Sequence, residues 1–216
     1  MEQSLLLEMD VNKIMEEKVI DIRLVILILL SALMLTVVRI ILAYLSKKEY
    51  FSSDLDRWID NNTYLLKLSD ELLAISSVLF GSYIVLIVLD NIENSIFSIS
   101  IIIISLIFCL VCWIGIILLI GNLVYPVNGL KLTDSSGGYN ILVQIYSRLH
   151  LADLSLGLLT IFLSNLSNNQ YVLYSGYIVG CLQIAFTYYS RSIKIISHIT
   201  SIVLWFVWII IFQWYY

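Results

Sequence analysis

Long apolar runs separated by short polar segments make up most of the chain. A helix needs roughly 20 apolar residues to cross a hydrocarbon core of about 30 Å, and several of these runs are that long. The pattern predicts an all-α, polytopic transmembrane helix bundle that forms a single domain over residues 24–216. We expect about six membrane-spanning helices, near residues 24–45, 72–89, 97–124, 141–163, 171–189 and 195–212.

Two further helices are predicted outside the spans. Residues 1–23 repeat apolar side chains at helical spacing in a segment that is otherwise charged, which predicts an N-terminal amphipathic helix. Because its polar face is acidic, docking onto protein explains it better than attraction to anionic lipid, and a plain solvated helix is an equal alternative. A short interfacial helix between spans one and two would place Trp58 at the membrane surface. The acidic start of the chain predicts no cleaved signal peptide.

Several polar residues are spaced along the fourth predicted span. They follow one another at steps of three or four residues and therefore share one helix face. Ionisable groups in a membrane segment face a bundle interior or a wet cavity, so we expect the other helices to surround this face. We name Tyr146, His150, Asp153 and Thr160 the polar stripe; Gly157 and Ser164 continue it.

Two interpretations of the polar stripe follow from its charges. His150 and Asp153 are three residues apart and can hydrogen-bond, as in a proton relay or a pH sensor. Alternatively, Asp153 pairs with Arg39 or Arg148 and holds helices together, and we favour this structural interpretation. His198 follows a basic turn and is expected at the membrane interface.

Small residues predict close helix packing in the fifth span. Gly176 and Gly180 form a GxxxG pattern, which in an apolar segment lets two helix backbones approach. The pattern does not say which helix is the partner.

Composition supports a membrane position. The 216 residues are 60% hydrophobic and 13% charged, which leaves too little polar surface for a soluble globule. The net charge of -4 and the scattered 12 Lys and Arg residues argue against nucleic acid as a partner. Basic residues gather in loops 46–70, 125–139 and 190–195, which the positive-inside rule places in the cytoplasm. We expect the bacterial inner (plasma) membrane, with the side of the N-terminal arm left open.

No motif predicts an enzyme. Cys109 and Cys112 form a CxxC pattern that is similar to membrane quinone-linked disulfide enzymes of the vitamin K epoxide reductase kind. That resemblance implies a second, loop-borne cysteine pair, and because Cys181 is the single cysteine left, we exclude this activity. The sequence has no HExxH, no GxSxG and no carboxylate cluster for a metal. We therefore expect no catalysis, no cofactor and no metal.

The sequence thus predicts a multi-pass integral membrane protein that acts by interaction. Its role would be an oligomeric scaffold, a sensor or a pore-forming effector subunit of a membrane complex. The expected partners are the lipid bilayer and either a second copy of the chain or a membrane or cytoplasmic protein. The competing prediction is a small ion- or proton-coupled transporter or channel, with Tyr146, Arg148, His150 and Asp153 lining its path.

Overall fold

Six helices and no strand form the part of the chain that the computed structural model describes, residues 22–47, 55–92, 95–125, 135–187 and 195–215. The predicted amphipathic helix over residues 1–23 lies almost entirely outside the described residues. The helices are α2 (Ile22–Lys47), α3 (Leu55–Asp90), α4 (Ile96–Val124), α5 (Ser135–Ser164), α6 (Gln170–Phe186) and α7 (Ile195–Tyr215).

Four of these helices are long and apolar enough to cross a membrane. The candidate spans are Leu24–Ser46 in α2, Arg57–Asp90 in α3, Ile96–Val124 in α4 and Ile195–Tyr215 in α7. This result supports a membrane protein. The helices α5 and α6 do not meet the same criteria, because α5 carries ionisable residues near its middle and α6 has 17 residues. A count of six spans therefore remains a prediction.

The predicted interfacial helix is not a separate element. Helix α3 has 36 residues and continues from Leu55 to Asp90, with no proline and no glycine before Gly81 to break it. Trp58, expected at the membrane surface, packs into the core with 9% of its surface exposed. At a rise of about 1.5 Å per residue, α3 is about 54 Å long and exceeds the hydrocarbon core.

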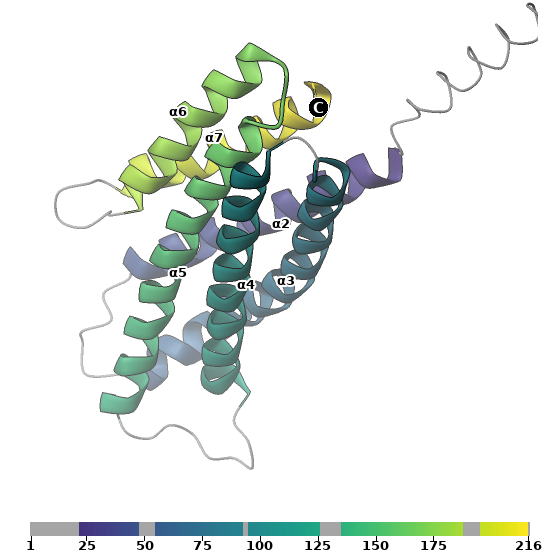
Figure 1. Ribbon diagram of the computed structural model, residues 1–216. Helices are drawn as coiled ribbons and strands as arrows, with labels where there is room; N and C mark the ends of the chain where they lie inside the picture. The colour runs from purple at the N-terminus through teal and green to yellow at the C-terminus, as the bar shows by residue number, and fades with distance from the viewer. Residues whose placement is uncertain (1–21, 48–54, 93–94, 126–134, 188–194, 216) are drawn as a thin grey trace, which may run out of the picture.

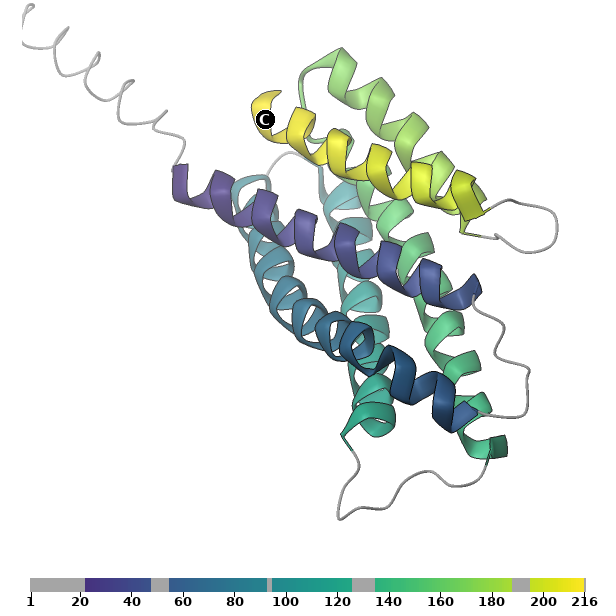
Figure 2. The same cartoon turned by 180° about the vertical axis from the view of Figure 1, so that it is seen from behind.

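The helices form a closed circuit of contacts. Each described helix packs against the next one along the chain, and α7 also packs against α2. Helices α3, α4 and α5 run beside one another, whereas α2 and α7 cross them at a steep angle (Figures 1 and 2). Side chains from the beginning and the end of the chain therefore meet in the interior of the circuit.

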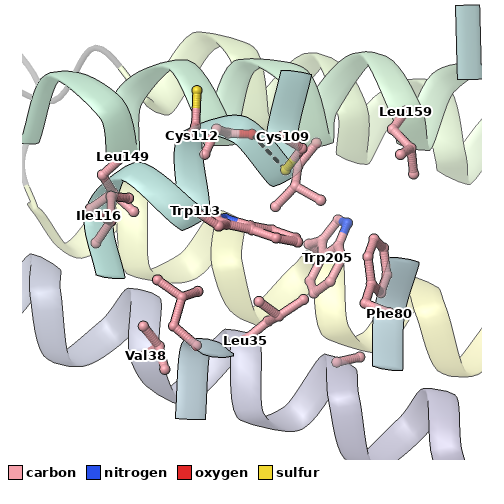
Figure 3. Packing of buried hydrophobic residues seen from close by; sticks show 14 of the residues in the cluster. Leu35, Val38, Phe80, Cys109, Cys112, Trp113, Ile116, Leu149, Leu159 and Trp205 are labelled. Atoms are coloured by element: carbon pink, nitrogen blue, oxygen red, sulfur yellow. Dashed lines mark hydrogen bonds between the residues drawn. The ribbon is translucent and has the colours of Figure 1, made fainter. Parts of the chain in front are cut away.

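Large aromatic side chains fill part of this interior. The ring of Phe80 on α3 lies 6.0 Å from Trp113 of α4 and 5.9 Å from Trp205 of α7, measured between ring centroids. Figure 3 shows the three rings beside Leu35 and Val38 of α2. Such aromatic contacts add to the stabilisation from buried area. Helices α2, α3, α4 and α7 are thus joined by direct packing at the centre.

The outer faces of the helices are apolar as well. Val78 on α3, Ile104 and Val111 on α4, and Ile178 on α6 each expose more than half of their surface. A soluble protein rarely exposes so many large apolar residues together. This distribution is typical of helices that face lipid.

Candidate functional site

A buried arginine joins three helices at the centre of the bundle. Arg39 on α2 has 1% of its surface exposed, and its Nε donates a hydrogen bond of 2.7 Å to Oδ1 of Asp153 on α5. Its Nη2 donates to Oε1 of Gln183 on α6. The guanidinium also faces the ring of Trp205, with Cζ 5.5 Å from the ring centroid. A buried charge is tolerated where it is paired and hydrogen-bonded, and Arg39 meets both conditions.

Gln183 extends these contacts to α7. Its side-chain oxygen accepts from Arg39, and its Nε2 donates to the backbone oxygen of Ser201. The hydroxyl of Ser201 in turn donates to the backbone oxygen of His198 over 2.7 Å. A glutamine suits this position because its amide carries both an acceptor and a donor.

His198 is buried beside Asp153, so its predicted interfacial position is wrong. Its exposed fraction is 1%, and its Nε2 lies 3.6 Å from Oδ2 of Asp153. The sequence held a signal for this burial, because His198, Ser201, Trp205 and Trp208 follow one another at steps of 3, 4 and 3 on the buried face of α7. We name Arg39, Asp153, Gln183 and His198 the central network.

The residues of the polar stripe do not all face the same surroundings in the structure. Asp153 and Thr160 face the interior, where Thr160 accepts a hydrogen bond of 3.1 Å from Nε1 of Trp205. His150 turns toward the end of α6 instead, with its Nδ1 3.1 Å from Oγ1 of Thr187. Tyr146 is half-buried one turn away. The expected hydrogen bond between His150 and Asp153 is therefore replaced, because the Asp153 carboxylate is engaged by the charged group of Arg39, which is the stronger donor.

Arg148 is not the partner of Asp153. Five residues separate the two along α5, which turns their side chains about 140° apart around the helix. The guanidinium of Arg148 lies over Gly115 of α4, where an added methyl group would overlap Nη1 and lie 2.6 Å from Cζ. Of the two arginines proposed from the sequence as partners, the structure brings Arg39 to Asp153.

The glycines of the GxxxG pattern pack against other helices of the same chain. A methyl group on Gly180 would lie 2.7 Å from the backbone oxygen of Gly157 on α5. One on Gly176 would lie 2.8 Å from Oγ of Ser164 and 3.0 Å from Nε1 of Trp208. The sequence did not specify the partners of this seam, and the structure places it against α5 and α7.

The cysteines on α4 have a packing position. Cys109 is buried, and its Sγ donates to the backbone oxygen of Ala152 over 3.7 Å. Cys112 and Cys181 are also free thiols. In the part of the chain that the structure describes, no group of three or more His, Cys, Asp or Glu residues is placed to hold a metal ion.

No protein-family model, curated protein or solved structure matches this chain. Function therefore has to be inferred from the chemistry of the central network and from the surface of the bundle.

The central network is suited to closing the circuit of helices. Arg39 near the beginning of the chain binds Asp153 and Gln183 near its end, so α2 is held to α5 and α6 as well as to α7. The charges of Arg39 and Asp153 cancel. Removing one partner of such a pair would leave an uncompensated charge in a low-dielectric interior, which costs about 3–5 kcal/mol.

Proposed function

We propose that this protein acts by interaction, as a subunit of a membrane complex or of an oligomer of its own chain. In this proposal the central network holds the helical body in one arrangement, so that its surface can serve as a scaffold, a sensor or the wall of a pore. The observation that carries it is the contact of 2.7 Å between Arg39 and Asp153, whose side chains are 1% and 2% exposed. The carboxylate that a proton relay would need is occupied by a guanidinium group.

The position in the membrane is supported by the two ends of the bundle. Large exposed side chains mark the end where α4 and α6 begin and α7 finishes: Phe97, Tyr171 and Trp214. Aromatic residues favour the boundary between lipid and water. The basic segments 46–70, 125–139 and 190–195 adjoin the opposite helix ends, where α2, α4 and α6 finish and α3, α5 and α7 begin. By the positive-inside rule this pattern supports one cytoplasmic face, in a bacterial inner membrane.

A second candidate is a small ion- or proton-coupled transporter or channel. One observation favours it: His198 Nε2 lies 3.6 Å from Oδ2 of Asp153, so a titratable ring is next to the buried carboxylate. In this alternative His198, rather than His150, would exchange the proton.

Flux through the purified protein separates the two functions. Protein reconstituted in vesicles that contain a pH-sensitive dye should show no proton flux above that of protein-free vesicles if it acts by interaction. In mild detergent its mass should exceed that of one chain in a micelle. Flux that rises with the amount of protein, and that Asp153→Asn and His198→Gln abolish while His150→Gln leaves it intact, would overturn the proposal in favour of the transporter.

A further inference from the structure

Arg148 is a charged residue within α5 that has no ion-pair partner among the described residues. It is half-buried on α5, and its guanidinium lies across Gly115 of α4 at the outer edge of the contact between these helices. Among the residues that the structure describes, none accepts a hydrogen bond from Arg148 or forms an ion pair with it. An arginine in such a place needs an acceptor from outside the chain.

The depth of Arg148 places this acceptor near a membrane surface. The predicted span of α5 begins at Ile141, seven residues before Arg148, which corresponds to about 10 Å along the helix. Side chains on a helix tilt toward its N-terminus, and the N-terminus of α5 is at this membrane surface. The guanidinium therefore lies within reach of a headgroup that sinks slightly below its ordinary level.

The exposed residues of α4 and α5 near Arg148 change from polar to apolar along the two helices. Toward the membrane surface, Gln144 and Asn140 follow on the same face of α5, and Asn122 follows on the face of α4 that carries Gly115; all three are exposed. Toward the membrane centre the corresponding positions are Leu151 and Val111, which are exposed and apolar. A molecule with a polar head and an apolar tail matches this order of surfaces.

The described helices of a second copy of the chain offer no carboxylate at this depth. Asp153 is buried and already paired within its own chain. Asp70 lies one turn from Lys67, whose Nζ is 5.3 Å from the ring centroid of Tyr125, so it is level with the end of α4, about 15 Å from Gly115. The remaining acidic residues of the described helices are Asp56, Asp60, Glu71 and Asp90. Glu71 follows Asp70, and the other three lie near the two ends of α3.

We propose that the surface between α4 and α5 at Arg148 binds the phosphate group of an anionic phospholipid. The planar guanidinium matches two phosphate oxygens at once. Gly115 provides the space for it, because any larger residue would overlap the guanidinium. The acyl chains would lie along Val111 and Leu151. This binding site goes beyond the proposed function and does not depend on it.

Lipid titration of the purified full chain tests the site. Protein in mild detergent is titrated with phosphatidylglycerol or phosphatidylcholine, and bound lipid is counted by native mass spectrometry. We expect the protein to prefer phosphatidylglycerol by at least about fivefold, since an ion pair in a poorly solvated site is stronger than one in water. Arg148→Gln should remove this preference. Gly115→Ala, which keeps every charge, should reduce it because the guanidinium loses its place.

Matched variants separate this site from general attraction of anionic lipid. Arg57→Gln removes a positive charge from an exposed position at the same end of the bundle and should leave the preference within about twofold. Arg148→Lys keeps the charge without the planar fork and should give an intermediate value. If Arg148→Gln does not fold, the site is tested with Gly115→Ala and Arg148→Lys. An unchanged preference for phosphatidylglycerol in both variants overturns the proposal.

Three further outcomes overturn it. Equal losses in Arg148→Gln and Arg57→Gln would mean that surface charge alone attracts the lipid. A wild-type protein without preference would mean that Arg148 meets another acceptor, such as a carboxylate of a partner protein. Displacement of the lipid by inorganic phosphate at the same concentration would assign the site to a free anion.

Discussion

Arg39 and Arg148 both lie well inside their helices, but their surroundings are opposite. Arg39 is buried and donates hydrogen bonds to Asp153 and Gln183, whereas Arg148 is partly exposed and has no acceptor among the described side chains. Both would be scored alike by any measure of hydropathy. The difference shows that the position of a charge around its helix decides whether other helices of the bundle can pair with it.

The largest expected effect comes from the same substitution at both positions. Arg39→Leu leaves Asp153 buried without a partner and should lower the free energy of unfolding by about 3–5 kcal/mol. Arg148→Leu leaves no buried carboxylate behind and should change the free energy of unfolding by less than about 1 kcal/mol. Both values are measured by titrating purified protein with denaturing detergent. Equal losses at the two positions would contradict the comparison.

A smaller effect is expected at the crossing of α5 and α6, which separates close packing from charge. Gly180→Ala would bring its methyl group to 2.7 Å from the backbone oxygen of Gly157, so the helices must move apart. We expect a loss of about 1–3 kcal/mol. Gly121→Ala is the matched control, since nothing lies within 4 Å of an added methyl group there, and it should be neutral or stabilising by up to about 1 kcal/mol. The stability of both variants is measured by thermal unfolding. Similar changes in the two variants would argue against close packing where α5 and α6 cross.

The smallest effect is expected at His150, which the structure takes out of the central network. His150→Gln removes a contact of 3.1 Å with Thr187 and should cost about 0.5–1.5 kcal/mol. Thr187→Val should cost a similar amount, and the double variant should cost less than the sum because both lose one shared contact. A loss of unfolding free energy as large as that of Arg39→Leu would show that His150 belongs to the central network.

The helix positions could be predicted well where apolar runs are long and bounded by polar loops. The predicted spans 24–45, 97–124 and 195–212 lie within α2, α4 and α7, each of which extends beyond them by no more than three residues at either end. The start of α3 was missed. Its first turns are polar enough to resemble a surface helix, and no feature of the sequence shows that they continue straight into the span.

The candidate site was predicted in part. The spacing around Asp153 correctly placed it in an interior, but the choice between Arg39 and Arg148 depends on a contact across 114 positions in the sequence. Local spacing favoured His150 over His198, because a neighbour on the same helix is visible in the sequence and one on another helix is not. Gln183 shares a helix face with Gly180, and a glutamine on a packed membrane face is the signal that could have identified it.

A double-mutant cycle between Arg39 and Asp153 tests the central claim most directly. The free energy of unfolding is measured for Arg39→Leu, for Asp153→Leu and for the double variant. Each single variant should lose about 3–5 kcal/mol, and the double variant should recover much of that loss because neither charge is then left unpaired. The coupling energy should be at least about 2 kcal/mol. Losses that add to within about 0.5 kcal/mol would show that the two residues do not act as a pair.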